Sequence, residues 1–226
     1  MPSTTPIAEA RALFGDDMLA PDDVARAFGT GPERLTADGA LLTQVPYDSD
    51  VLRAAHARGH LLTFRAPTDG EVPLTVLRLI ERFPDAIQAK LLKGVGYLLK
   101  DEWTLDQEPF AGRDTCHLEW RLVHREPIPE TRNLSYALQD AALARYAESV
   151  GLPGLRRRSG IAMVYDTLLF ARACGVKLLE HTWDWSDTPT GDGGFVTAGE
   201  LSSDGLRVLG YSRAVRFGTL GICAEY

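Results

Sequence analysis

The sequence contains few cysteines, and this excludes two classes of small protein. Its 226 residues include only three, Cys116, Cys174 and Cys223, which are far apart and form no C-x-x-C pair. Disulfide scaffolds and zinc ribbons need more cysteines at closer spacing, so neither is expected. Each cysteine lies in an apolar pattern, where a free thiol behaves as a small buried hydrophobic group.

Long hydrophobic runs are also missing. No segment approaches the roughly 20 apolar residues that a membrane-spanning helix needs. The first residues, Met1-Pro2-Ser3-Thr4, have neither the basic flank nor the apolar core of a signal peptide. The sequence therefore predicts a cytoplasmic protein that has no membrane partner.

An excess of positive charge is absent as well. The net charge is −7 and the pI is near 5.3, which disfavours an extended nucleic-acid surface, because such surfaces form a basic face. Only four of the 24 cationic residues are lysine. Arginine binds carboxylates and phosphates through a planar fork, although genome base composition produces the same bias.

The standard catalytic and cofactor motifs do not occur. The sequence has no phosphate-binding loop, no dinucleotide fingerprint, no H-E-x-x-H helix and no G-x-S-x-G elbow. The glycine-rich segment 191–194 precedes a strand rather than a helix, so it is interpreted as a turn. No cofactor and no enzyme class follow from these motifs.

What is present is the composition of a globular domain. Hydrophobic residues make up 45% of the chain and charged residues 24%, which are ordinary values. We expect a flexible tail over residues 1–8 and a single α+β domain over 9–226, with one candidate subdivision near 100–114.

Helical and strand patterns define that α+β domain. Helices are expected over 7–14, 21–28, 50–58, 74–83, 134–150 and 160–174, with Asn133 as the N-cap of the fifth. Segment 86–99 fits either a helix or a helix followed by a strand. Strands are expected over 60–65, 115–125, 176–186, 195–201, 206–211 and 216–225. They predict one largely antiparallel or mixed sheet packed against helices, with a C-terminal β-meander. Segment 160–174 is apolar on nearly every side, so it should be the central core helix.

The sharpest functional pattern is Arg156-Arg157-Arg158-Ser159, directly before that core helix. Cations at a helix N-terminus are disfavoured by the helix dipole unless an anion is near. Arginine forks, the Ser159 hydroxyl and free backbone N–H groups would together bind a phosphate or carboxylate. The alternative is that these arginines point outward or pair with the acidic residues of the chain.

A weaker pattern occupies residues 180–187. On a strand, His181 would share one face with Trp183 and Trp185, while Asp184 would face the opposite side. Only a bulge or a strand end near Asp184 would let His181, Asp184 and Asp187 converge on a cation, so no metal is predicted. The tryptophans fit either the core or an exposed binding surface.

Asp166 is the third candidate because it is a charged residue within the apolar core helix. If it is buried, it needs a cationic partner, for which Arg172 or one of Arg156 to Arg158 would serve. Buried carboxylates of this kind form structural ion pairs or act as acids and bases.

Three functional hypotheses remain open. The first is a binding or interaction protein that holds an anionic small molecule or protein partner at Arg156–Ser159. The second is a hydrolase or transferase acting on an anionic substrate, with Asp166, His181 or Asp184 as acid, base or ligand. The third is a subunit of a larger assembly of unspecified oligomeric state, joined through a strand edge.

Overall fold

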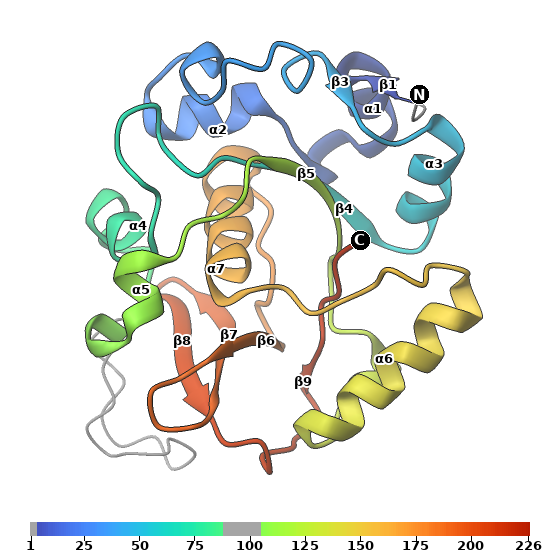
Figure 1. Ribbon diagram of the computed structural model, residues 1–226, viewed down its shortest axis with the longest axis vertical. Helices are drawn as coiled ribbons and strands as arrows, with labels where there is room; N and C mark the ends of the chain where they lie inside the picture. Colours follow the sequence, from blue (N-terminus) through green and yellow to red (C-terminus); the bar gives the residue numbers. More distant parts are fainter. Residues whose placement is uncertain (1–3, 88–104) are drawn as a thin grey trace.

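The computed structural model describes residues 4–87 and 105–226, and its helices and strands form the predicted α+β fold (Figure 1). The helices are α1 (Ile7–Phe14), α2 (Pro21–Phe28), α3 (Ser49–Ala57), α4 (Val76–Arg82), α5 (Pro109–Arg113), α6 (Tyr136–Val150) and α7 (Gly160–Leu169). The strands are β1 (Thr5–Pro6), β2 (Met18–Leu19), β3 (Gln44–Val45), β4 (His60–Arg65), β5 (Glu119–His124), β6 (Trp183–Pro189), β7 (Phe195–Ser202), β8 (Gly205–Tyr211) and β9 (Leu220–Gly221). Most of the ambiguous segment 86–99 and part of the candidate boundary at 100–114 lie outside the described residues.

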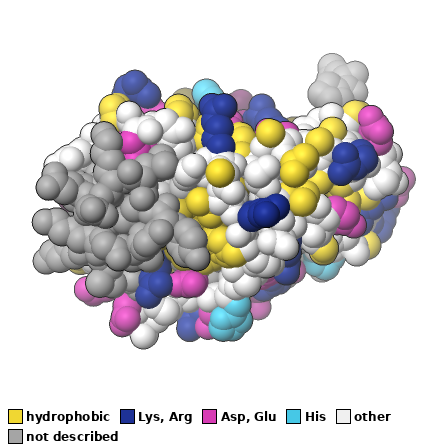
Figure 2. Space-filling model, turned by 90° about the horizontal axis from the view of Figure 1, so that it is seen from below, with side chains coloured by type: hydrophobic (Ala, Val, Ile, Leu, Met, Phe, Trp, Pro, Cys, Tyr) yellow, Lys and Arg dark blue, Asp and Glu magenta, His cyan; other side chains and the backbone are white. Residues whose placement is uncertain are grey.

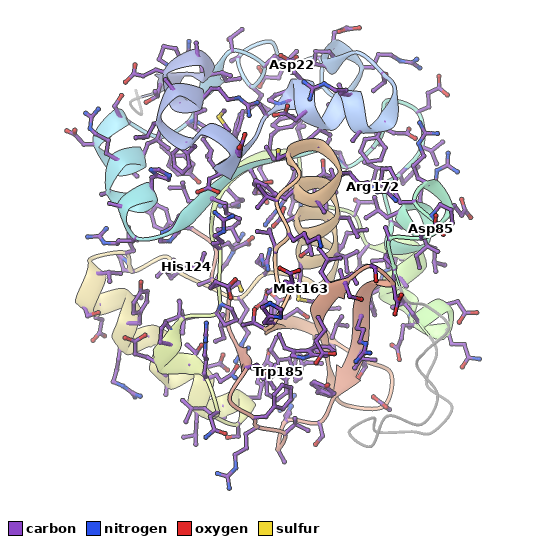
Figure 3. All side chains as sticks on the ribbon, turned by 180° about the vertical axis from the view of Figure 1, so that it is seen from behind. Asp22, Asp85, His124, Met163, Arg172 and Trp185 are labelled. Carbon is purple, nitrogen blue, oxygen red and sulfur yellow. The ribbon has the colours of Figure 1, made fainter. Side chains whose placement is uncertain are left out.

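Helix α7 is the centre of the molecule, as its apolar sequence predicts. Ser159 caps it by accepting a hydrogen bond from the Ala162 N–H (3.3 Å), and every residue from Gly160 to Leu169 is buried. A π-helical turn over Phe170–Cys174 extends the helix, and Gly175 ends it in the left-handed conformation (φ 70°). Figure 3 shows Met163 of α7 surrounded by side chains from the neighbouring elements.

The strands form three separate sheets, so the expectation of one sheet is wrong. Strands β1 and β3 form a small pair, β2-β4-β5 form a second sheet, and β8-β7-β6-β9 form a third. Helix α7 contacts β4 of the second sheet and β6, β7 and β8 of the third. The second and third sheets therefore both pack against α7 and shield its apolar surface from water. They do so without pairing with each other.

The C-terminal segment connects these two sheets. Strand β9 pairs in parallel with β6, and the residues after it run beside β5. There the His124 N–H donates to the Ala224 carbonyl (2.8 Å), and the Tyr226 N–H donates to the Leu122 carbonyl (2.9 Å). Of the strand predicted over 216–225, only Leu220–Gly221 forms a strand, which is β9. Isolated bridges follow it.

Two predicted boundaries differ from the structure for local reasons. The strand expected from Val176 begins only at Trp183, because Leu179 takes the left-handed conformation (φ 58°) and interrupts the extended backbone. Helix α6 begins at Tyr136 with Ser135 in the N-cap position, because the expected cap, Asn133, is itself left-handed (φ 57°).

The N-terminal region is more ordered than the flexible tail expected over residues 1–8. Thr5 is buried, pairs with Val45 of β3, and donates a hydrogen bond from its hydroxyl to the Tyr47 carbonyl (2.8 Å). Helix α1 then begins at Ile7. Among the described residues, the tail is therefore part of the domain from Thr5 onward.

The surface shows no unusual segregation on the face in Figure 2. Lys and Arg side chains there are scattered among hydrophobic, acidic and neutral ones. None of the helices in the described parts of the chain is long and apolar enough to cross a membrane.

Candidate functional site

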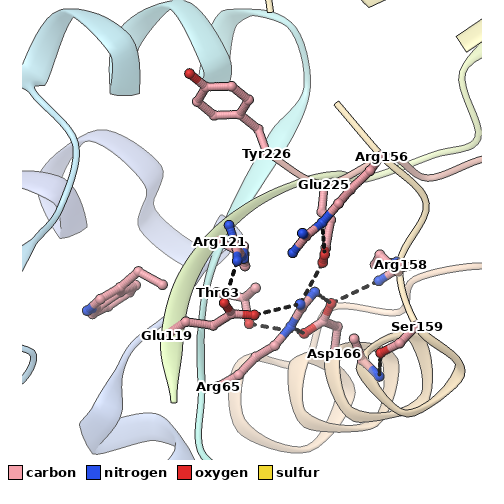
Figure 4. A network of polar contacts seen from close by, with 12 residues as sticks. Thr63, Arg65, Glu119, Arg121, Arg156, Arg158, Ser159, Asp166, Glu225 and Tyr226 are labelled. Atoms are coloured by element: carbon pink, nitrogen blue, oxygen red, sulfur yellow. Dashed lines mark hydrogen bonds and ion pairs between the residues drawn. The ribbon is translucent and has the colours of Figure 1, made fainter. Parts of the chain in front are cut away.

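Alternating charges form a continuous ladder through the interior, which we call the ionic ladder. It runs from β6 through α7 and the end of β4 to the C-terminal segment, and it finishes in the segment just before α7. Figure 4 shows the part from Arg158 to Arg156. Its members, in order, are Asp184, Arg158, Asp166, Arg65, Glu225 and Arg156.

Asp166 lies in the middle of the ionic ladder and is fully buried. Arg65 binds both of its carboxylate oxygens, Nε to Oδ1 at 2.9 Å and Nη2 to Oδ2 at 2.6 Å, and Arg158 adds a third bond at 3.0 Å. Burial by itself raises the pKa of Asp166, but Arg65 and Arg158 outweigh it and hold the pKa below its usual value. Asp166 is therefore a charged structural partner, and Arg158 is the cation that the sequence analysis sought for it.

Arg158 connects Asp166 to Asp184 at the inner end of the ionic ladder. Its Nε and Nη2 both donate to Asp184 Oδ2, at 3.0 and 2.7 Å, and the Cys223 N–H donates to Oδ1 at 2.7 Å. Burial lowers the pKa of Arg158, yet Asp184 and Asp166 more than restore it, so the guanidinium stays protonated. Both Asp184 oxygens are thus used inside the protein.

Arg157 points away from the ionic ladder, into the junction between α6 and β6. Its guanidinium donates to Asp140 (2.7 Å) and to the backbone carbonyls of Trp185 (2.8 Å) and Tyr136 (3.0 Å). It also stacks over the Tyr136 ring at 3.9 Å. All three guanidinium nitrogens therefore have partners within the protein.

Arg156 forms the outer end, and its environment is different. Its side chain is 57% exposed, and its Nε donates to Glu225 Oε1 at 3.0 Å. The backbone of Arg156 also pairs with that of Glu225 through two hydrogen bonds (3.0 and 2.9 Å). Among the described residues, no side chain binds its two terminal nitrogens, so they remain available to a ligand.

A cleft with a volume of about 430 Å³ opens beside this outer end. Its inner wall includes buried residues from the first turn of α7 and the outer side of the ionic ladder. Its walls are formed by Arg65, Asp114, Thr115, Cys116, His117, Glu119, Arg156, Ser159, Ile161, Ala162, Asp187 and Glu225. Of the four residues predicted to bind an anion, Arg156 and Ser159 line this cleft, whereas Arg157 and Arg158 do not.

Four acids and two arginines line the cleft, and three of the acids have arginine partners. Glu225 pairs with Arg65 and Arg156, and the other acidic residues, Glu119 and Asp114, pair with Arg121 and Arg113. Among the described residues, the exception is Asp187, which forms no ion pair.

Asp187 also has a raised pKa. The hydroxyl of Thr188 is its one side-chain hydrogen-bond partner among the described residues, at 3.4 Å. Burial and, secondly, the Glu225 carboxylate raise the pKa of Asp187 above its usual value. Acid therefore removes the charge of Asp187 more easily than that of an ordinary aspartate.

The remaining sequence candidates lie elsewhere. His181 is exposed and lines a separate pocket with Lys177, Glu180 and Arg207. Within residues 4–87 and 105–226, no three His, Cys, Asp or Glu side chains are grouped to hold a metal ion. Trp183 and Trp185 are buried, which answers the question that their pattern left open.

The cysteines are poor nucleophile candidates in this environment. Cys116 and Cys223 are buried and Cys174 is partly buried, and none forms a disulfide. Burial raises the pKa of all three thiols, that of Cys174 to about 11. They therefore stay protonated at neutral pH, and the protonated form reacts slowly.

A second buried polar pair lies at the opposite end of β4. His60 and His124 face each other across the β4–β5 ladder, with ring centroids 4.2 Å apart. The Tyr146 hydroxyl of α6 contacts His124 Nε2 at 3.0 Å, and His60 Nε2 has no described partner. Burial lowers the pKa of His60 to about 4 and that of His124 to about 3, so both rings are neutral at pH 7.

Sequence reasoning missed Arg65 and Glu225, although the ionic ladder depends on both. The available signal was a charged residue in an apolar strand, because all six residues of β4 are buried. That signal indicates a buried charge but not its partner, since Arg65 binds residues more than 100 positions away.

In comparisons with known proteins, no family model, curated protein or solved structure matched this chain.

Proposed function

We propose that the protein binds a small molecule through an anionic group, held in the cleft at the N-terminus of α7. The observation that carries this proposal is the exposed guanidinium of Arg156 in a cleft that also opens on Ser159 and the first turn of α7. No catalytic step is needed for this role.

The proposal rests on the local electrostatics of that cleft. The N-terminus of α7 carries a partial positive charge, although the Gly160 N–H already donates to Thr188 Oγ1 and the Ala162 N–H to Ser159 Oγ. The terminal nitrogens of Arg156 add a full charge in a geometry suited to a carboxylate or phosphate. An anion placed between them would meet both, without disturbing the inner ionic ladder.

A ligand-induced stability shift tests this function. Acetate, butyrate, phosphate and sulfate should be compared as probes by thermal unfolding of the wild-type protein and of Arg156→Gln. A probe present at about 100 times its Kd stabilises the folded state by roughly 2.7 kcal/mol. We expect this shift for at least one probe in the wild-type protein and its loss in Arg156→Gln.

Arg145→Gln is the matched control, because Arg145 is an exposed arginine on α6 that does not line the cleft. It should retain the wild-type shift. Equal shifts in the wild-type protein and in Arg156→Gln would contradict the proposed site.

An enzyme acting on an anionic substrate is the second candidate function, and one observation favours it. Asp187 borders the cleft and has a raised pKa, as catalytic acids do. Asp166 and Asp184 are fully buried and bound by arginines, so they are less suited to that role. A screen of phosphate and carboxylate esters tests it: hydrolysis that Asp187→Asn leaves unchanged would exclude Asp187 as the acid.

A further inference from the structure

A second cavity, of about 510 Å³, adjoins the cleft and has a different character. The two cavities share Arg156 and Asp187 in their walls. The remaining wall is formed by α6 and the segment that connects α6 to α7 (Figure 1). We call this second cavity the α6 groove.

Aliphatic side chains form much of the α6 groove. They are Leu143, Ala144, Ala147, Pro153 and Leu155. Three of them, Leu143, Ala147 and Leu155, belong to a small hydrophobic cluster that is separate from the main core. The groove therefore has a packed apolar floor, and a methylene chain lying on it would be removed from water.

We propose that the ligand is an amphiphilic carboxylate, with its carboxylate at Arg156 and an aliphatic chain in the α6 groove. This inference rests on the proposed function, because it takes the same anion site as the position of the head. Arg156 lies on the boundary between the cavities, so one molecule bound to it reaches both. A small inorganic anion would leave the aliphatic floor in water.

The acidic residues at the rim of the α6 groove favour a ligand whose far end carries no negative charge. Asp140 and Glu148 line the groove, and both are exposed acidic residues. Arg157 also lines it, but its side chain is 4% exposed and is bound to Asp140 and the backbone. A second carboxylate at the end of the chain would meet these acids, so a monocarboxylate should bind better than a dicarboxylate of equal length.

A homologous series measures the contribution of the chain. Acetate, butyrate, hexanoate and octanoate should be titrated below their aggregation concentrations by calorimetry, with suberate as the eight-carbon dicarboxylate. Each methylene buried in the α6 groove should tighten binding by up to about fourfold, until the chain outgrows the groove. Suberate should bind more weakly than octanoate.

Two variants locate the chain. Ala144→Asp places a charge in the wall of the α6 groove and should remove the gain with chain length while leaving acetate binding unchanged. Ala141→Asp is the control, because Ala141 is also exposed on α6 but does not line the groove. Both positions are on the helix surface, so the fold should tolerate both changes.

The outcomes separate this inference from the proposed function. If short carboxylates bind through Arg156 but longer chains bind no more tightly, the α6 groove assignment is overturned and the anion site stands. If Ala144→Asp and Ala141→Asp show the same gain with chain length, the chain lies elsewhere and the assignment is also overturned. If phosphate or sulfate binds through Arg156 but no carboxylate does, the amphiphilic carboxylate is overturned and the anion site stands. If none of these anions binds, both proposals fail.

Discussion

Arg158 and Arg156 are two positions apart in the sequence, yet their side chains differ in burial and in the number of carboxylates that bind them. The Arg158 side chain is 1% exposed and is bound by two buried carboxylates. The Arg156 side chain is 57% exposed and shares one carboxylate with Arg65. We call the part of the ionic ladder around Arg158 the inner region and the part around Arg156 the outer region. The buried Arg158 must keep its protein partners, whereas the exposed Arg156 is able to exchange its partner for a ligand.

The difference follows from desolvation. Removing a guanidinium from water costs several kcal/mol, so a buried arginine must have partners in every folded molecule. A half-exposed arginine remains partly hydrated, so its protein partner contributes little and a ligand can compete for it. The inner region therefore contributes to stability, and the outer region is where we propose that a ligand binds.

The largest expected effect comes from breaking the inner region. Arg158→Met would leave Asp184 without its cation and Asp166 with one cation fewer, at a cost of about 3–5 kcal/mol in the free energy of unfolding. Arg156→Met should cost less than about 1 kcal/mol, because Glu225 keeps Arg65. Urea unfolding of both variants measures the difference.

The same long, flexible side chain is introduced in both variants, so each serves as the control for the other. Equal losses of stability would show that burial does not separate the two regions. A larger loss in Arg156→Met would reverse their roles.

Acid should reveal a second buried region that behaves differently from the ionic ladder. The unfolded state protonates His60 and His124 near pH 6.5, whereas the folded state resists protonation down to about pH 4 and pH 3. The unfolded state therefore binds more protons as the pH falls from 7 to 4, and stability declines over that window. At about 1.4 kcal/mol per pKa unit, the pair should account for roughly 2–4 kcal/mol between pH 7 and pH 5.

Urea unfolding as a function of pH tests this effect. His124→Gln should flatten the decline, whereas His117→Gln, which changes an exposed histidine, should leave it intact. A decline that His124→Gln does not reduce would place the acid sensitivity outside this pair.

The smallest expected effect sharpens the description of the outer region. Among the described residues, Asp187 is the acid of the cleft that forms no ion pair, so Asp187→Asn should strengthen binding of an anionic probe by about 1 kcal/mol, roughly fivefold. Because the pKa of Asp187 is raised, wild-type affinity should increase as the pH falls and Asp187 loses its charge. Binding by Asp187→Asn should lack that component, and titration calorimetry at several pH values measures it. Weaker anion binding by Asp187→Asn would show that the ligand also carries a positive group near this carboxylate.

Local patterns predicted some of these features and not others. The α+β class and the central position of α7 were predictable, because an apolar helix of this kind must be enclosed on all sides. The division into separate sheets was not, since strand patterns predict pairs of consecutive strands such as β7 and β8 but not pairs that are distant in the sequence, such as β4 and β5. The late start of β6 was not predictable either. Left-handed residues are usually glycine or asparagine, and Leu179 is neither.

The candidate site divides in the same way. The clustering of Arg156, Arg158 and Ser159 before α7 was visible in the sequence, and so was the need of Asp166 for a cation. The identity of Arg65 as its main partner was not, because that contact spans 101 positions. The separation of Arg156 from its two neighbours also depends on tertiary packing, which three consecutive identical residues do not encode.

The long span of the ionic ladder has a consequence for how the protein folds. Arg65 meets Asp166 across 101 positions and Glu225 across 160, so the central charges come together only after large loops close. A partly assembled ladder would hold charges that are dehydrated but not yet neutralised. The folding barrier should therefore respond to salt and pH more strongly than a hydrophobic core alone would allow, and refolding should be slow compared with proteins built from local contacts.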